Sequence, residues 1–390
     1  MNKKFNVLIV LNEAPLPFSG AASRWYHILI QGLEKRGVNF TIVGSCKKYE
    51  EKVELEKKYP QSFFYLHDHH KKNLFQKIKT LFRPFSYTAP KEMREKIKSL
   101  DLNSFNVVHV EQVFATYAFD KIPKHAFVSV HYLASLDQAN VETFGLRDKL
   151  ISWLMKYTEK KLLKNYGFVK TCSQEIEEKI RSWYPEKKYS HFPFAIDPSQ
   201  YNFVPDEVRP KGKNVLLVAS MNWLPGKTAA INLIERIWPL IKANNPQAIL
   251  RIVGFDARTV LLNYLNEKQI EIYENVPDVF PYFEQANILV YFPNAGSGVK
   301  IKIQESMLIG IPVITNQFGA EGLNLQHLEH CMLANNEFEA AKWSHQLLND
   351  FELQNNIRKK ARAFIESECS EEKIISKIEL IYLEIGKNNE

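Results

Sequence analysis

The sequence predicts an α/β protein with two doubly wound, parallel-sheet domains that face each other. Apolar runs typical of buried strands alternate with amphipathic helices, which indicates parallel sheets covered on both faces. This alternation starts afresh at "NVLLVASMN", after the polar, proline-containing stretch "AIDPSQYNFVPDEVRPKGKN". The chain has 390 residues, 45% of them hydrophobic, which is enough for two cores.

The elements of the first half follow from their apolar spacing. The run "FNVLIVLN" predicts a buried strand, and Trp25, Ile28, Leu29 and Leu33 recur at helical spacing before the next strand in "KRGVNFTIVG". Further strands are predicted at "FNVVHVEQ" and "AFVSVHYL", followed by a helix over 146–165. This half forms the predicted amino-terminal domain, 1–205.

The second half repeats the pattern. A strand at "NVLLVASMN" precedes a helix over 229–244, strands at "AILRIVGF", "IEIYENV" and "NILVYFP", a helix after Gly298, and the strand "IPVIT". We expect a second domain over 206–370. We also expect a carboxyl-terminal helix, 371–390, that crosses back to pack on the first domain.

Composition narrows the classes of function. No apolar run reaches the length of a membrane span, and the start has too short an apolar run for a signal peptide, so we expect a cytoplasmic protein. The four cysteines are far apart, which fits reduced thiols. Residues 71–98 hold nine lysines and arginines against two glutamates, which equals the net charge of +7 of the whole chain. Because the remainder is close to neutral, a nucleic-acid binder is not expected.

The loop "PNAGSG" lies between a predicted strand and the helix that follows it. Small residues let the backbone approach a ligand, and a helix start presents free N–H groups to an anion. The loop is therefore either a phosphate site or a tight turn. On the following helix, Lys302 and Glu305 share a face with Ile301 and Leu308. They either pair with each other or face a ligand, the lysine on a phosphate and the carboxylate on ribose hydroxyls.

The segments "SMNWLPGKTAAINLIERIWPLIKANNPQAILRIVG" and "ENVPDVFPYFEQANILVYFPNAGSGVKIKIQESMLIGIPVITNQFGAEGLN" resemble the donor-binding half of GT-B glycosyltransferases. The match covers nearly all of 214–325 and is most similar to the branch of glycosyltransferase family 4 with the signature G-S-G-x-[RK]-x-K-x-x-E-[AS]-M. The amino-terminal half is similar more loosely, through "PLPFSGAASRWYHILIQGLEKRGVNFTIVG", "CSQEIEEKI" and "HFPFAID". The resemblance implies two Rossmann-like domains and retaining transfer of a sugar from a nucleoside diphosphate sugar.

Site roles are carried over from this resemblance. Glu305 would bind the donor ribose, and Lys227, Lys300 and Lys302 would neutralise the diphosphate. His131 would lie in the cleft, and His131, Lys227, Lys302 and Glu305 form the expected catalytic set. The other expected donor-binding residues are Gly20, Gly254, Val276, Gly296, Ser297, Gly298 and Glu321.

The sequence departs from the family pattern at two positions. The paired-glutamate motif has a first glutamate eight residues before Glu305, where this chain has Ser297, and Met221 stands where many members carry an arginine. The G-S-G branch commonly lacks that first glutamate, so the departure does not indicate inactivity. Sugar recognition is thus less defined than nucleotide recognition.

No metal or other cofactor is expected. Negative charge builds on the departing diphosphate, and cations with helix N–H groups stabilise it. The histidine-rich "LHDHHKK" would be a solvated loop rather than a metal site.

The acceptor side has fewer signals. Arg24 opens the first helix and either meets an acceptor phosphate or lies on a solvated face. The stretch from Lys71 to about Phe85 has apolar residues at helical spacing, with Lys72, Lys77 and Lys79 between them. It is either a helix at an anionic membrane surface or a helix packed on its own domain.

The sequence therefore predicts a retaining, hexosyltransferase-type glycosyltransferase of cell-surface polysaccharide or glycoconjugate synthesis. Its partners would be a nucleotide-sugar donor, a glycan or lipid-linked acceptor and an anionic membrane surface, with a peripheral position at the inner membrane face. The alternatives are a nucleotide-sugar epimerase of GT-B architecture and a catalytically silent nucleotide-sugar binding protein.

Overall fold

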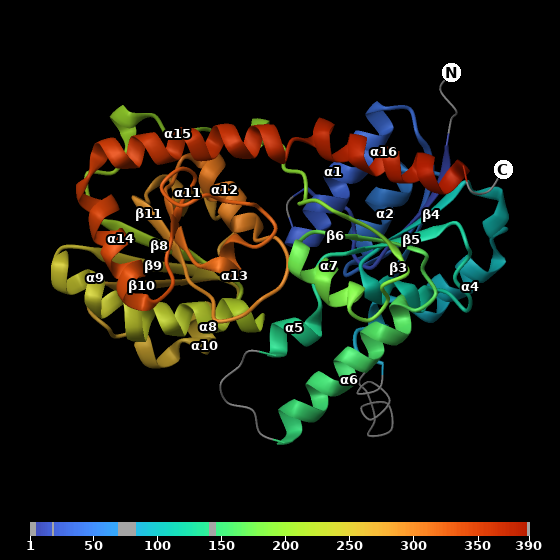
Figure 1. Cartoon of the computed structure of the whole chain (residues 1–390), viewed down its shortest axis with the longest axis horizontal. Helices are drawn as coiled ribbons and strands as arrows, with labels where there is room; N and C mark the ends of the chain where they lie inside the picture. The colour runs from blue at the N-terminus through green and yellow to red at the C-terminus, as the bar shows by residue number, and fades with distance from the viewer. Residues whose placement is uncertain (1–4, 18, 69–82, 140–145, 388–390) are drawn as a thin grey trace. The chain divides into compact units, whose positions relative to one another are not determined.

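The computed structural model describes residues 5–17, 19–68, 83–139 and 146–387, and the chain forms two compact units (Figure 1). Unit 1 comprises 1–135, 142–196 and 371–390, and unit 2 comprises 136–141 and 197–370. Among the helices of the described ranges, none is both long enough and apolar enough to cross a membrane.

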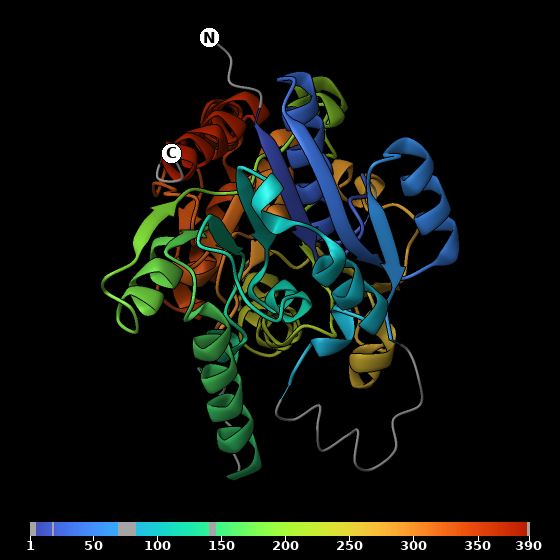
Figure 2. The ribbon, with the colours of Figure 1, turned by 90° about the vertical axis from the view of Figure 1, so that its right-hand side faces the viewer.

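Unit 1 contains a seven-stranded parallel sheet in the order β3-β2-β1-β4-β5-β6-β7 (Figure 2). Its strands β4 and β5 are buried along their whole length. The strands are β1 (Asn6–Leu11), β2 (Asn39–Cys46), β3 (Phe63–Leu66), β4 (Val107–Glu111), β5 (Ala126–Val130), β6 (Phe168–Thr171) and β7 (Lys188–His191). The helices numbered before β8 are α1 (Ala21–Lys35), α2 (Tyr49–Lys58), α4 (Lys91–Ser99), α5 (Ala134–Ala139), α6 (Leu146–Leu163) and α7 (Gln174–Arg181). Buried on both faces, β1 reads as the continuous apolar run that predicted it, whereas the equally buried β4 holds His109 and Glu111 among its valines.

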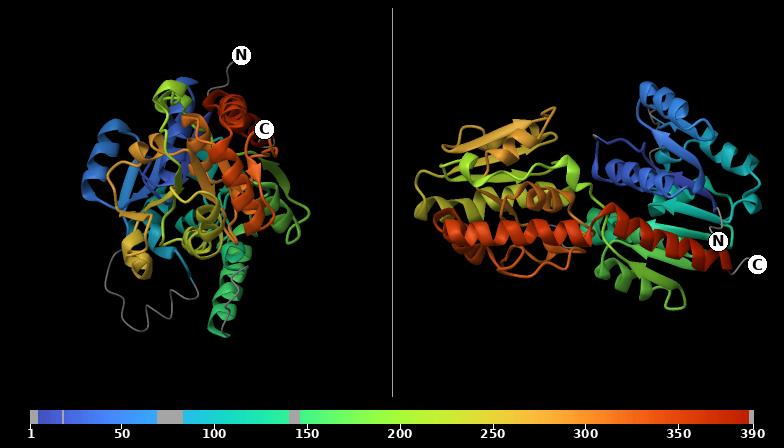
Figure 3. Two further views of the ribbon diagram at one scale, coloured as in Figure 1. Left: turned by 90° about the vertical axis from the view of Figure 1, so that its left-hand side faces the viewer. Right: turned by 90° about the horizontal axis from the view of Figure 1, so that it is seen from above.

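Unit 2 contains a six-stranded parallel sheet in the order β10-β9-β8-β11-β12-β13. Its strands are β8 (Asn214–Val218), β9 (Ile249–Gly254), β10 (Ile270–Glu274), β11 (Ile288–Tyr291), β12 (Val313–Thr315) and β13 (Met332–Leu333). Its helices are α8 (Leu224–Asn232), α9 (Trp238–Asn244), α10 (Ala257–Val260), α11 (Phe280–Glu284), α12 (Ile301–Ile309), α13 (Gln317–Ala320), α14 (Glu337–Asn349) and α15 (Phe351–Glu368). Helix α12 packs against α15, the long orange-red helix of this unit in Figure 3. The prediction of two doubly wound α/β domains is confirmed.

The chain passes into unit 2 at Asp197, before the sequence-based boundary at 205/206. The residues between these points are held by unit 2, since the Val204 backbone N–H donates to Ile309 at 2.9 Å and the Tyr201 hydroxyl donates to Glu305 at 3.2 Å. The last helix, α16 (Glu371–Lys387), belongs to unit 1 and packs on α1 and β4. Its Glu371 forms a salt bridge of 2.8 Å with Lys35.

The predicted helix from Lys71 to about Phe85 lies mostly outside the described residues, as do Lys72, Lys77 and Lys79. Its described end, Arg83–Phe85, is not helical, and Phe85 has a left-handed backbone conformation with φ of 58°. Of the "LHDHHKK" stretch, predicted to be a solvated loop, the structure describes only residues 66–68. His67 is buried, and its Nε2 lies 3.0 Å from the Ser45 hydroxyl.

Candidate donor site and a buried cluster in unit 1

The loop between β11 and α12 has the backbone that its glycines predicted. Gly296 and Gly298 have φ values of 134° and 78°, which favour glycine. A Cβ on Gly296 would also lie 3.1 Å from the Pro225 side chain of α8. The loop thus packs tightly on α8 and leads directly into α12, with Lys300 as the residue before its first turn.

Ser297 in this loop holds a buried carboxylate from a distant segment. Its backbone N–H donates to Asp137 Oδ1 at 2.6 Å and its hydroxyl donates to the same oxygen at 2.7 Å. Trp223 Nε1–H donates to Asp137 Oδ2 at 3.1 Å. Burial raises the pKa of Asp137, although the Ser297 bonds and the Lys300 charge work in the opposite direction. The loop therefore already presents hydrogen-bond donors to an anionic oxygen.

Lys300 contributes positive charge at this carboxylate, and Lys302 follows it on the first turn of α12. The Lys300 ammonium is buried and donates to the Gly298 carbonyl oxygen. Lys302 Nζ lies 4.2 Å from the centroid of the Tyr291 ring and 5.9 Å from that of the Trp223 ring. Burial lowers the pKa of Lys302 to about 7, with a further contribution from the Lys300 charge and opposition from Glu305. An anion that binds next to Lys302 would raise the pKa of this lysine and favour its charged form.

Glu305 is buried on the same helix and accepts a hydrogen bond from the Tyr201 hydroxyl at 3.2 Å. Lys302 forms no salt bridge with any described residue, although it feels the Glu305 charge. The structure thus gives Lys302 an aromatic neighbour in place of the intrahelical ion pair considered from sequence. A buried carboxylate and a partly neutral lysine, one turn apart, form a site suited to a ligand with hydroxyl and anionic groups.

The remaining predicted residues of unit 2 are placed around its sheet. Lys227 is exposed on α8, and Glu321 follows α13. Gly254 ends β9, where a Cβ would lie 1.7 Å from the Ala219 carbonyl oxygen, so close backbone packing already requires glycine there. Val276 is half-buried in the turn after β10, and Met221 is buried. The structure brings Ser297, Lys300, Lys302 and Glu305 together on one loop and helix.

The predicted residues of unit 1 are Gly20, Arg24 and His131. Gly20 is exposed at the start of α1 and accepts the Arg24 backbone N–H at 3.1 Å. Arg24 is half-buried on that helix. His131 follows the carboxyl end of β5, and its side chain is buried.

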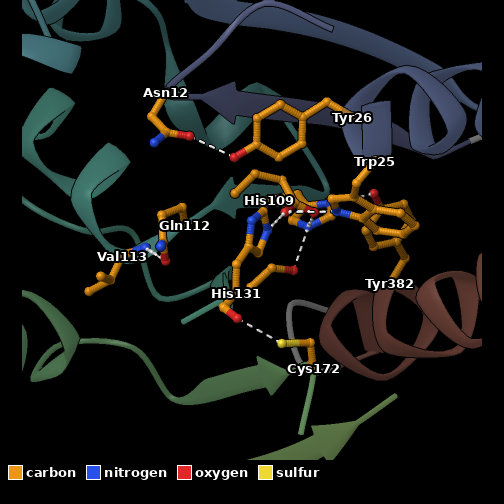
Figure 4. A network of polar contacts seen from close by, with 11 residues as sticks. Asn12, Trp25, Tyr26, His109, Gln112, Val113, His131, Cys172 and Tyr382 are labelled. Carbon is orange, nitrogen blue, oxygen red and sulfur yellow. Dashed lines mark hydrogen bonds and ion pairs between the residues drawn. The ribbon is translucent and has the colours of Figure 1, made fainter. Parts of the chain in front are cut away.

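His131 belongs to a buried polar cluster at the carboxyl ends of the strands (Figure 4). Its Nε2 bonds to Glu111, whose other oxygen lies 2.8 Å from His109 Nε2. Trp25 Nε1–H donates to Glu111 at 3.1 Å. The two histidines hold the pKa of Glu111 below its usual value although burial acts to raise it, whereas burial lowers the pKa of His131.

Lys170 of β6 lies fully buried in the same region. Its ammonium lies 4.7 Å from the centroid of the Phe192 ring, 5.1 Å from that of Phe194 and 5.4 Å from that of Trp25. Burial lowers its pKa while the Glu111 charge raises it. Aromatic faces therefore take the place of a direct counter-ion for this lysine.

Sequence reasoning missed Asp137, Trp223, Glu111 and Lys170. Charged residues inside apolar strands, in "VVHVE" and "FVKT", were the signal for the unit 1 cluster. For Asp137 the sequence carries no such signal. Within the described ranges, no group of three or more His, Cys, Asp or Glu side chains is arranged to hold a metal ion.

Residues 212–350, which contain the loop, α12 and their surroundings, match the family described as Glycosyl transferases group 1. No curated protein matches the chain.

Three solved structures illustrate the likeness of the whole fold. Sucrose-phosphate synthase from Thermosynechococcus elongatus has a TM-score of 0.73 at 14% identity, covering 98% of this chain and 99% of that one. TarM of S. aureus, solved as a mutant with fondaparinux, α-GlcNAc-glycerol and UDP, has a TM-score of 0.67 at 11% identity, with coverage of 97% and 99%. HepE of Anabaena, solved with UDP and glucose, has a TM-score of 0.64 at 12% identity, with coverage of 96% and 98%. The chain therefore has the fold of the GT-B glycosyltransferases, and its residues 212–350 match the glycosyltransferases of group 1.

Proposed function

We propose that the protein transfers a sugar from a nucleoside diphosphate sugar, with retention, to a glycan or lipid-linked acceptor. The observation that carries this proposal is the cluster of buried Ser297, Lys300 and Glu305 with half-buried Lys302 on the loop and first turns of α12. It lies inside the segment that matches glycosyltransferases group 1. HepE solved with UDP-glucose, a structural neighbour, supports a nucleotide-sugar donor.

The chemistry assigns a task to each group. Glu305 accepts hydrogen bonds from the ribose hydroxyls, and Lys302 lies one turn earlier to meet the diphosphate. As the glycosidic bond loosens, negative charge accumulates on the leaving diphosphate. Lys227, Lys300, Lys302 and the N–H groups of Gly296, Ser297 and Gly298 stabilise that charge more in the transition state than in the ground state. In this proposal the step requires no bound metal ion.

The finer parts of the proposal come from sequence and family pattern. The transferred group is a hexose, and the product belongs to cell-surface polysaccharide or glycoconjugate synthesis. The protein works in the cytoplasm, peripheral to the inner membrane face. TarM, whose structure contains α-GlcNAc-glycerol and UDP, supports a glycan acceptor.

A thermal-shift screen over nucleoside diphosphates and their sugars identifies the donor. With that donor, transfer to isolated membrane lipids or glycans is followed by mass spectrometry, and the anomeric configuration of the product by NMR. Transfer that requires an added acceptor supports the proposal. Conversion of the donor sugar without acceptor indicates the epimerase alternative, and stable binding without any turnover indicates a silent binding protein.

A further inference from the structure

One side of helix α6 exposes large apolar side chains. Trp153 is 60% exposed, and Tyr157 and Leu150 are each 57% exposed. The Trp153 and Tyr157 rings stack, with centroids 5.8 Å apart and planes inclined by 15°. Contiguous exposed aromatic and aliphatic groups of this size mark a surface that binds something.

Lysines surround this apolar ridge. At about 100° per residue, Leu150, Trp153 and Tyr157 fall within one arc of about 140° that also holds four lysines. These are Lys149, Lys156, Lys160 and Lys161, all exposed except the half-buried Lys160. We call these seven residues the α6 face.

The α6 face carries no opposing charge from the described side chains of its own helix. Glu159 points to the other side, where it is buried and accepts a hydrogen bond from the Ser135 hydroxyl. Leu154 and Thr158 are buried on that side as well, and α6 packs there on the short helical segment Val113–Ala118. Figures 1 and 2 and the left view of Figure 3 show the amino-terminal half of α6 extending away from the other described elements of unit 1.

We propose that the α6 face docks unit 1 onto an anionic lipid bilayer. Tryptophan and tyrosine favour the interface, where the ring contacts acyl chains and the polar atom stays hydrated. Lysine stems lie along apolar surface while their ammonium groups reach lipid phosphates, and each lysine adds attraction to an anionic leaflet. A protein partner fits less well, because the cores of protein interfaces are depleted in lysine.

Membrane docking rests on the proposed function in one respect: a lipid-linked acceptor lies in the bilayer, so the enzyme must bind the membrane surface to reach it. Docking itself needs no donor. Vesicle binding and nucleotide binding are therefore measured separately. Failure to bind vesicles would contradict membrane docking alone, and failure to bind nucleotide would contradict the proposed function alone.

The experiment uses the full chain with vesicles of phosphatidylcholine alone or of phosphatidylcholine and phosphatidylglycerol in equal parts. We expect cosedimentation with the anionic vesicles, a blue shift of tryptophan fluorescence on binding, and release at high salt. Replacing Trp153 and Tyr157 with serine, or Lys156 and Lys161 with glutamate, should weaken vesicle binding more than tenfold. The fluorescence shift should be smallest in the Trp153→Ser background.

Matched controls separate the α6 face from general charge and hydrophobicity. Lys57→Glu with Lys359→Glu changes the net charge equally at exposed positions elsewhere, and Phe338→Ser removes another exposed ring. Both controls should keep wild-type binding, and circular dichroism should confirm that every variant is folded.

Three results would overturn the inference. The first is a wild-type chain that does not bind anionic vesicles at low salt. The second is wild-type vesicle binding by folded α6-face variants. The third is self-association that these variants abolish without any change in vesicle binding, which would make the face an interface between copies of the chain.

Discussion

Asp137 and Ser297 are joined by two hydrogen bonds to a single carboxylate oxygen, one from the Ser297 backbone at 2.6 Å and one from its hydroxyl at 2.7 Å. Ser297 is also the position where the resembling family carries its first glutamate. In this chain the carboxylate at the loop comes from Asp137. Its second oxygen, Oδ2, accepts a hydrogen bond from Trp223 Nε1–H. The Asp137 carboxylate thus occupies the backbone and hydroxyl donors of Ser297 that we propose for the diphosphate.

Replacing Asp137 with alanine should strengthen the binding of a nucleoside diphosphate by about tenfold, because the ligand no longer displaces a charge-assisted hydrogen bond. Calorimetry with the nucleoside diphosphate that the thermal-shift screen identifies measures the change. Asp137→Asn, which keeps an acceptor oxygen without charge, should give an intermediate affinity. Weaker binding in the alanine variant would show that Asp137 organises the loop for its ligand instead of competing with it.

The lowered pKa of Lys302 predicts proton uptake on binding. With a pKa of about 7 in the free protein, Lys302 is mostly neutral at pH 8, and a bound diphosphate raises its pKa again. Binding of the nucleoside diphosphate at pH 8 should therefore take up close to one proton, measured by calorimetry in buffers of different ionisation enthalpy. Lys302→Met should abolish the uptake, and exposed Lys227→Met should retain it. Equal uptake in wild type and Lys302→Met would refute this assignment.

Glu305→Ala should weaken the binding of the nucleoside diphosphate by about one to two decades, because the ribose hydroxyls lose a charged acceptor worth roughly 1.5–3 kcal/mol. Tyr201→Phe is the matched control. It removes the internal hydrogen bond to Glu305 and leaves the carboxylate in place. Calorimetry should show near wild-type nucleotide affinity for this control. An unchanged nucleotide affinity in folded Glu305→Ala would show that Glu305 does not bind the ribose.

The parts of the fold that sequence predicted are those where burial imposes a pattern. Strands β1, β4, β8 and β11 lie inside the sheets, and their apolar runs were readable. The short strand β13, with two residues at a sheet edge, offers too little pattern to recognise. A strand can therefore be predicted from its hydrophobic pattern only when it is long enough and buried enough to impose one.

The candidate site shows the same limit in another form. The loop glycines and the charged pair on α12 were visible because local backbone and helical spacing fix them. The Asp137 contact joins positions 160 residues apart, and although the loop around Ser297 was predicted, nothing in the sequence near Asp137 indicates that it is the partner. Long-range polar contacts depend on the packing of the whole unit and are invisible to local patterns.

Activity should persist in excess chelator, because Lys227, Lys300 and Lys302 supply the positive charge at the diphosphate. Transfer rates with EDTA and with added magnesium or manganese test this on the same preparation. A parallel measurement on Lys302→Met should show a large loss of rate that added metal does not restore. Complete loss in EDTA with recovery on adding a divalent ion would place a metal in the step.

The buried cluster of unit 1 predicts a pH-dependent contribution to stability. Glu111 is fully buried between His109 and His131, and removing its charge leaves these groups and nearby Lys170 without an anion. Glu111→Gln should lower the free energy of unfolding by about 3–5 kcal/mol at pH 7, measured by urea denaturation. The exposed Glu54→Gln on α2 provides the control and should change stability little.

The direction with pH follows from the pKa of Glu111, which is lower in the folded protein than its ordinary value of 4.5. Its contribution is therefore complete above that value and is lost as the pH falls below it, when the unfolded chain takes up the proton first. The difference in stability between wild type and Glu111→Gln should shrink between pH 6 and pH 3. If the difference stays constant over this range, Glu111 is not held ionised by its histidines, and His131 lacks the charged partner that orients it.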